Sequence, residues 1–183
     1  ILASGSPRRQ QFFKELDLNY TIRLKEIEEI YPEHLQAEEI TNFLAELQAS
    51  AFENELNEND VLVTSDTIVW LNGKALGKPK DYDDSFKMLQ QLANQTHEVI
   101  TSVCLKSIDK TDVFHCVTKV TFANLSDEAI RYYLDNYQAF DKAGSYGIQD
   151  WIGLIGISKI EGSYTNVVGL PTEMLFQKLM NYA

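Results

Sequence analysis

Residues 1–9 read ILASGSPRR, which combines a short apolar run, a turn and the start of a helix. Residues 1–4 have the character of the end of a buried strand, and Gly5 and Ser6 turn the chain. Pro7 suits the first position of a helix, where its missing N–H needs no partner, and Ser6 is the expected N-cap. We therefore predict a strand–turn–helix unit at this end of the chain.

The same turn has the chemistry of an anion-binding site. A helix N-terminus exposes backbone N–H groups and carries about half a positive charge. Ser4 and Ser6 add hydroxyl donors, and Arg8 and Arg9 add guanidinium groups whose geometry matches phosphate oxygens. The alternative is a capped surface helix with two solvated arginines, but arginine in a first turn opposes the helix dipole. The pattern therefore favours phosphate binding.

The remaining chain alternates between helical and extended patterns. An Asn72-Gly73 pair between extended segments predicts a β-hairpin. Apolar spacing predicts helices near 7–16, 37–56, 81–93, 126–134 and 171–180, and strands near 20–24, 61–71, 97–106, 112–122 and 151–160. Because strict βαβ repetition is missing, we predict an α/β protein with a mixed sheet. No linker divides the chain, so residues 1–183 are predicted to form a single domain.

Composition limits the function classes. The net charge of −11 disfavours a general role in binding nucleic acid. The same charge opposes a polyanionic substrate, so a triphosphate would need a local basic cluster and a divalent cation. No apolar run approaches the ~20 residues of a membrane helix, and no signal-peptide pattern is present. Cys104 and Cys116 lie in apolar segments and are expected to be reduced, which indicates a cytoplasmic location.

Carboxylates and one lysine are further candidates for chemistry. Asp66 follows an apolar strand, a usual place for a catalytic carboxylate, although a turn-forming role is the alternative. Glu28 or Glu29 could join Asp66 in holding a hard cation, and the alternative is a solvated acidic loop. Lys78, fixed before a proline, could neutralise phosphate charge or be an ordinary exposed lysine. His34, His97 and His115 lack metal-ligand spacing and are expected to be structural.

Four ordered blocks of sequence resemble the Maf family of nucleotide pyrophosphatases, and together they span essentially the whole chain. The first is residues 1–9, and the second is Ser65-Asp66-Thr67-Ile68-Val69 with Gly77-Lys78-Pro79. The third is residues 141–149, DKAGSYGIQ, and the fourth is residues 162–171, GSYTNVVGLP. Any one block alone would be a weak signal, but four in order at plausible spacing are highly specific.

The resemblance implies an elongated α/β fold, with a mixed central sheet flanked by helices and two lobes around a deep cleft. It implies cleavage of nucleoside triphosphates between the α- and β-phosphates with Mg²⁺ or Mn²⁺, chiefly of dTTP and UTP. Related proteins are often dimers, and the family has been linked to septum formation. The implied roles are Asp66 as proton acceptor, Glu29 with Asp66 as metal ligands, and Ser4, Arg8, Arg9, Thr67, Lys78 and Gln149 as substrate contacts.

Two residues depart from the family pattern. Gln48 stands where a lysine is expected, which would remove one phosphate contact of about 1–3 kcal/mol if that contact is charge-assisted. Asp150 follows Gln149 where glycine is common. Two alternatives stay open at this stage. One is the same chemistry on a purine or modified guanine triphosphate, and the other is a nucleotide-binding regulator of cell division with little catalysis.

Overall fold

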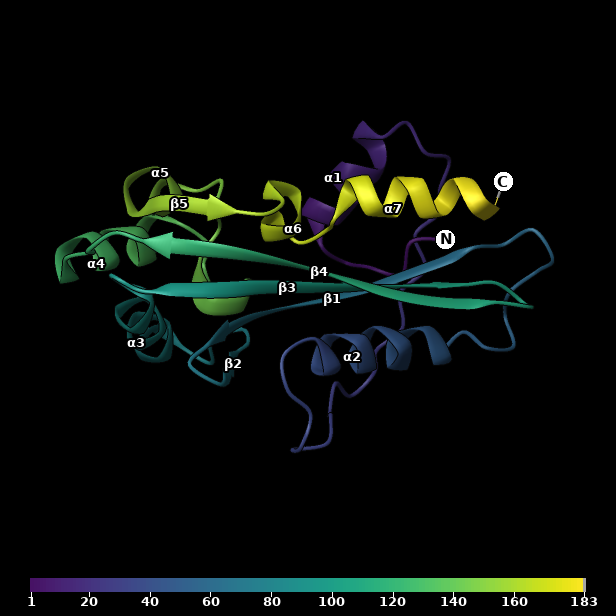
Figure 1. The fold of residues 1–183 in the computed structure, drawn as a ribbon, viewed down its shortest axis with the longest axis horizontal. Coiled ribbons are helices and arrows are strands. Elements are labelled where there is room, and N and C mark those ends of the chain that lie inside the picture. The colour runs from purple at the N-terminus through teal and green to yellow at the C-terminus, as the bar shows by residue number, and fades with distance from the viewer. Residues whose placement is uncertain (183) are drawn as a thin grey trace. The chain divides into compact units, whose positions relative to one another are not determined.

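The computed structural model describes residues 1–182, in which helices and strands alternate along the chain (Figure 1). The predicted α/β class is confirmed. Within residues 1–182, no helix combines the length and apolar character needed to cross a membrane. The elements are α1 (Pro7–Glu15), α2 (Glu38–Ser50), β1 (Leu62–Leu71), β2 (Lys74–Leu76), α3 (Tyr82–Leu92), β3 (Thr96–Lys106), β4 (Thr111–Phe122), α4 (Asp127–Asn136), the 3-10 turn η1 (Ala143–Ser145), α5 (Trp151–Gly156), β5 (Ile157–Glu161), α6 (Tyr164–Val168), α7 (Thr172–Leu179) and the 3-10 turn η2 (Met180–Tyr182).

The five strands form one sheet in the order β2-β1-β3-β4-β5. β1 pairs with β2 and β4 pairs with β5, both antiparallel, and Leu71 lies opposite Lys74 across the predicted two-residue hairpin. The parallel component comes from Leu2, which bridges both Val63 and Ile22. Backbone hydrogen bonds from Ala3 N–H to the Val63 carbonyl, at 2.9 Å, and from Val63 N–H to the Ile1 carbonyl, at 2.8 Å, fix this pairing. The prediction of a mixed sheet is therefore confirmed.

The chain divides into two compact units, and the first comprises residues 1–67, 101–116 and 169–183. Within this unit, alternate residues of the strands face opposite sides, as the pleat of a strand requires. Leu62 and Cys104 pack against α2, whereas Val63 and Val103 belong to the cluster that includes residues of α1 and α7. α2 therefore covers one face of these strand segments, and α1 and α7 cover the other. The prediction of a single domain over residues 1–183 stays a prediction, and its last residue lies outside the described part.

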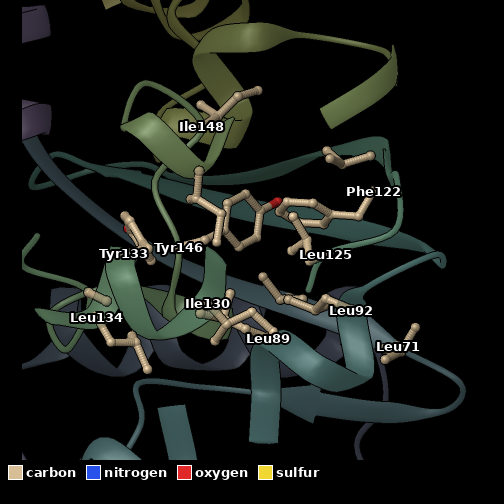
Figure 2. Packing of buried hydrophobic residues seen from close by; sticks show 14 of the residues in the cluster. Leu71, Leu89, Leu92, Phe122, Leu125, Ile130, Tyr133, Leu134, Tyr146 and Ile148 are labelled. Atoms are coloured by element: carbon tan, nitrogen blue, oxygen red, sulfur yellow. The ribbon is translucent and has the colours of Figure 1, made fainter. Parts of the chain in front are cut away.

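The second unit comprises residues 68–100 and 117–168 and has its own core. Figure 2 shows this core, in which Tyr146 lies beside Phe122 and near the leucines of α3. The Tyr146 and Phe122 rings meet edge to face with centroids 5.0 Å apart, and His97 stacks on Phe122 at 5.7 Å. The buried Nε2 of His97 lies 2.7 Å from the Tyr146 hydroxyl oxygen. The sequence-based view of His97 as a structural residue agrees with this position.

The burial of His97 predicts a pH-dependent stability. Burial lowers the pKa of His97 from 6.5 to about 4. Between these values the unfolded chain binds a proton that the folded chain does not, so the free energy of unfolding falls as pH falls through this range. At about 1.4 kcal/mol per pKa unit, the His97 contribution is roughly 3 kcal/mol.

Urea denaturation at pH 7 and pH 4.5 measures this contribution by comparing the native protein with His97→Gln, which cannot titrate. The native protein is expected to lose more stability on acidification than the variant does. Replacing the exposed His115 by glutamine is the matched control, and it should leave the pH dependence of the free energy of unfolding unchanged. Equal pH dependence in the native protein and His97→Gln would contradict the prediction.

Two predicted strands differ from the structure. Residues 20–24 make only an isolated bridge at Ile22, where the chain pairs with Leu2 before entering an exposed segment. Residues 151–160 begin as helix α5 rather than as strand, and only β5 is extended. Ile152 and Gly156 are buried whereas Leu154, midway between them, is exposed. A helix gives this pattern, whereas a strand would place all three residues on the same face. A short apolar run does not distinguish these two forms by its pattern alone.

Candidate active site

The candidate site in the first unit begins at the N-terminus of α1. The Ser6 side chain accepts a hydrogen bond from the Arg9 N–H at 3.5 Å, and Pro7 occupies the first helical position, so the predicted cap is confirmed. Ser4 is buried, and its hydroxyl oxygen accepts a hydrogen bond from the Ser6 N–H at 3.3 Å. The turn is thus held in one conformation by its own serines. This conformation places Arg8 and Arg9 in the first turn of the helix.

The guanidinium group of Arg9 is fixed by oxygen acceptors from two distant parts of the chain. Its Nε donates to the Gly169 carbonyl at 2.8 Å. Its Nη1 donates to the Ser65 carbonyl at 2.5 Å, and its Nη2 donates to the Thr67 hydroxyl at 3.0 Å. These contacts use three of the five N–H donors of a guanidinium group. Arg9 therefore holds the Ser65 carbonyl on one side of Asp66 and the Thr67 side chain on the other. Its two remaining N–H donors are left for a phosphate.

Three of the predicted site residues carry charges that act on Arg9 in this unit. Burial lowers the pKa of Arg9 below its ordinary value, and Arg8 lowers it further. Asp66 and Glu29 oppose these effects and raise the pKa of Arg9. Asp66, Glu29 and Arg8 therefore each lie within electrostatic range of the Arg9 guanidinium. The Arg9 guanidinium, on the first turn of α1, is thus acted on by two carboxylates and a second guanidinium group.

The donor set fits a cation that is shared with a substrate. Among residues 1–182, no group of three or more histidine, cysteine, aspartate or glutamate side chains is placed to hold a metal ion. Asp66 and Glu29 supply two carboxylates, and Mg²⁺ is usually bound by one or two carboxylates together with substrate phosphates and waters. The pair suits an ion that arrives with, or is completed by, a phosphate ligand.

Thr67 is tied into a hydroxyl network rather than standing alone. Its Oγ1 accepts from Arg9 and lies 2.9 Å from the Oγ1 of Thr101 on β3. This network couples the middle of β1 to the neighbouring strand β3. The prediction that Asp66 follows the end of a strand is wrong, because β1 runs through it from Leu62 to Leu71. The substrate contact that the family resemblance implies for Thr67 stays a prediction.

Lys78 and Gln149 both belong to the second unit. Lys78 is exposed, and the carbonyl of the preceding Gly77 accepts a hydrogen bond from the Gly144 N–H at 3.0 Å. Gln149 is exposed and lies between buried Ile148 and partly buried Asp150. Their predicted contacts with substrate stay predictions.

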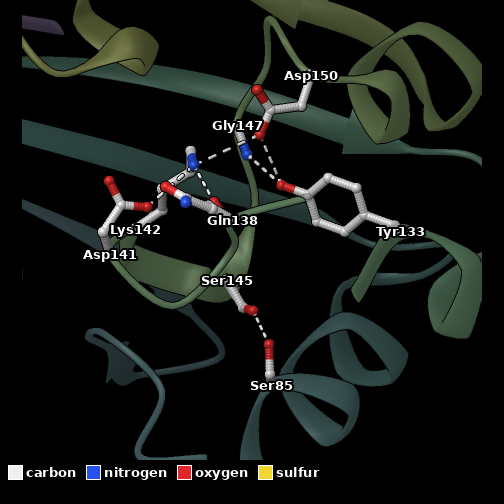
Figure 3. A network of polar contacts seen from close by, with 8 residues as sticks. All are labelled: Ser85, Tyr133, Gln138, Asp141, Lys142, Ser145, Gly147 and Asp150. Carbon is white, nitrogen blue, oxygen red and sulfur yellow. Dashed lines mark hydrogen bonds and ion pairs between the residues drawn. The ribbon is translucent and has the colours of Figure 1, made fainter. Parts of the chain in front are cut away.

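The loop that carries Gln149 is held by a polar network, which Figure 3 shows. The Tyr133 hydroxyl donates to Asp150 Oδ2 at 2.7 Å and accepts from the Gly147 N–H at 3.2 Å. Lys142 lies 3.6 Å from the same Asp150 oxygen. A Cβ at Gly147 would lie 2.5 Å from that oxygen, so only glycine fits there without movement. Asp150, which departs from the family pattern, thus anchors this loop.

Two features of the site were not assigned by sequence reasoning. Gln48 on α2 donates from Nε2 to Glu29 Oε1 at 3.0 Å, although the sequence marked it only as a missing lysine. Gly169 supplies the carbonyl that holds Arg9, and its φ of 127° requires glycine. The signal for Gly169 was present in the fourth sequence block, where a glycine precedes Leu170 and Pro171. No sequence signal links Gln48 to Glu29, which are 19 residues apart.

Comparisons with known proteins agree with the four sequence blocks. A protein of Flavobacterium psychrophilum named dTTP/UTP pyrophosphatase is 69% identical over 182 residues, which cover 100% of this chain and 93% of the relative. A protein of the same name from Flavobacterium johnsoniae is 64% identical over 179 residues, covering 98% and 92%. A solved nucleoside-triphosphatase (dITP/XTP pyrophosphatase) of Mycobacterium abscessus has 14% identity and a TM-score of 0.43, covering 98% of this chain and 92% of its own, too weak a likeness to carry over any property.

The family described as Maf-like protein matches residues 1–182. The match includes the helix N-terminus, Asp66 and the Gly169 carbonyl that holds Arg9. This chain therefore belongs to the Maf-like protein family.

Proposed function

We propose that this protein hydrolyses dTTP and UTP to the nucleoside monophosphate and pyrophosphate. The observation that carries the proposal is the position of Arg9 on the first turn of α1, where its guanidinium binds the Ser65 carbonyl and the Thr67 hydroxyl on either side of Asp66. Guanidinium groups and helix N–H groups attract phosphate, whereas the carboxylates of Asp66 and Glu29 suit a cation and a proton transfer. The relatives that are 69% and 64% identical carry the name dTTP/UTP pyrophosphatase, which supports the choice of substrate.

In the proposed reaction, Asp66 accepts a proton from the attacking water. The water oxygen forms a bond to the α-phosphorus, and the bond from that phosphorus to the oxygen bridging to the β-phosphate breaks. Pyrophosphate leaves with the bridging oxygen. A divalent ion, when bound, supplies Lewis-acid polarisation of the phosphate oxygens. Glu29 and Asp66 are the residues that would hold it.

Negative charge builds up on the phosphates during this step, and cationic groups offset it. Arg8, the α1 N–H groups and the Ser4 hydroxyl are proposed to bind the phosphates, together with the N–H donors of Arg9 that its three protein contacts leave over. Lys78 is proposed to add a further positive charge. Thr67 and Gln149 are proposed to contact the base or sugar, as the family resemblance implies. Arg9 has a second role in this scheme, because it holds the residues on either side of Asp66.

A substrate panel tests the proposal. Pyrophosphate release is measured with Mg²⁺ for dTTP, UTP, dCTP, GTP and ATP at equal concentrations. We expect dTTP and UTP to give kcat/KM values at least tenfold above those of the purine nucleotides. Faster release from GTP or a modified guanine triphosphate would overturn the assignment of base. Tight nucleotide binding without pyrophosphate release would favour a regulatory protein instead.

We further propose that the protein works in the cytoplasm. Both cysteines are free thiols, and Cys104 is buried, where burial raises its pKa to about 11 and makes it unreactive. Free thiols of this kind are usual in a reducing compartment. The homodimer implied by the resemblance stays a prediction, which light scattering at several concentrations would test.

A further inference from the structure

Gln48 donates a hydrogen bond to Glu29, and the proposed reaction gives this contact no role. It lies on α2, three residues after Ala45 and seven after Thr41, so the three share one face of the helix. Thr41 Oγ1 lies 2.6 Å from Ser102 Oγ on β3, and the Ala45 carbonyl accepts from the Thr64 hydroxyl at 2.6 Å on β1. This face of α2 is thereby fixed to the strands. Gln48 is a partly buried side chain on a fixed support.

Glu29, by contrast, lies in a segment without helix or strand. Residues 23–34 are mostly exposed, and Glu29 itself is exposed. The hydrogen bond of 3.0 Å from Gln48 Nε2 to Glu29 Oε1 links this carboxylate to the rigid helix. A long side chain in an irregular exposed segment would otherwise sample several rotamers. The contact therefore limits where the Glu29 carboxylate lies relative to α2.

Whether the donor at position 48 is neutral or positively charged decides how this contact affects the negative charge of the Glu29 carboxylate. A carboxamide donates a hydrogen bond without bringing a positive charge, so Glu29 keeps its full negative charge. A lysine ammonium at the same distance would neutralise much of it and would compete with a bound cation. Glu29 also acts electrostatically on Arg9, the residue that holds both sides of Asp66. A neutral donor at position 48 thus favours a cation at this carboxylate.

We propose that Gln48 is a positioning residue, which holds the Glu29 carboxylate and leaves its charge available to a divalent cation. The inference rests on the proposed function in one respect, namely that the reaction uses such a cation. Gln48 itself touches neither substrate nor ion in this scheme and acts through Glu29. Residues that orient metal ligands in this way commonly change metal affinity by about 10- to 100-fold when they are replaced.

The experiment measures binding of Mn²⁺ alone by the electron paramagnetic resonance signal of the free ion. We compare the native protein with Gln48→Leu, which removes the donor at similar volume, and Gln48→Lys, which adds the charge. Because the hydrogen bond is exposed, we expect Gln48→Leu to weaken Mn²⁺ binding by about tenfold, the lower end of the usual range. Gln48→Lys is expected to weaken it at least as much. The Mg²⁺ concentration that gives half-maximal pyrophosphate release should rise in parallel.

A matched control exists on α1, where Gln11 Nε2 donates to Glu15 Oε1 at 2.8 Å in an exposed pair of the same kind. Gln11→Leu should leave Mn²⁺ binding as it is. A double-mutant cycle with Glu29→Gln separates positioning from a structural role, since Gln48→Leu should have no further effect once the carboxylate is gone. Unchanged Mn²⁺ binding in Gln48→Leu, or an equal loss in both Glu29 backgrounds, overturns the inference. Mn²⁺ binding without pyrophosphate release would overturn the proposed function and leave the role of Gln48 standing.

Discussion

Replacing Asp66 by asparagine is expected to abolish pyrophosphate release while the protein stays folded. Asparagine has nearly the same volume and can keep a hydrogen bond at this position. It cannot accept a proton from water at neutral pH, and it is a poorer ligand for a hard cation. We expect kcat to fall by roughly 100-fold to 10,000-fold, the range that general base catalysis usually contributes. Steady-state release of pyrophosphate from UTP measures the effect.

Asp60 provides the matched control for this change. It lies six residues before Asp66, is partly buried, and accepts hydrogen bonds from the Asn57 backbone and side chain at 2.9 Å. Asp60→Asn should keep nearly full turnover. Thermal unfolding of both variants checks that each is folded. Turnover of Asp66→Asn close to the native value would remove Asp66 from the proposed mechanism.

Replacing Arg9 by lysine is expected to reduce both activity and stability, although the charge is kept. Lysine has no planar fork, so it cannot donate together to the Gly169 carbonyl, the Ser65 carbonyl and the Thr67 hydroxyl. Hydrogen bonds from a charged donor contribute about 1.5–3 kcal/mol each, and lysine can replace one of the three. We therefore expect a loss of about 3 kcal/mol in the free energy of unfolding. Because the lost contacts flank Asp66, kcat/KM should fall by at least ~100-fold.

The stability is measured by urea denaturation and the activity by pyrophosphate release. Arg131→Lys is the matched control, because Arg131 is exposed and its guanidinium lies 4.4 Å over the Phe86 ring. That change should alter stability by less than about 1 kcal/mol. If Arg9→Lys kept native stability and native turnover, the three hydrogen bonds would have no part in shaping the site. If it lost activity at native stability, phosphate binding would be the main role of Arg9.

The local features of the fold could be predicted because they depend on neighbouring residues. The cap at Ser6, the first-turn position of Pro7 and the hairpin at Asn72-Gly73 follow from backbone preferences, and the structure confirms each of them. Residues 151–156 could not be predicted in the same way. Their helix is decided by what Ile152 packs against, and a short apolar run carries no sign of it.

The sequence by itself determined the family, through four blocks in order, and it determined which residue types could bind phosphate or a cation. Only the tertiary structure decided how those residues are arranged. It joined Arg9 to Gly169, which is 160 residues away, and it joined Gln48 to Glu29. The physical reason is that a hydrogen bond between distant residues depends on the packing of whole elements. Side-chain chemistry can be read from a sequence, but the partner of each donor is fixed only when the helices and strands pack together.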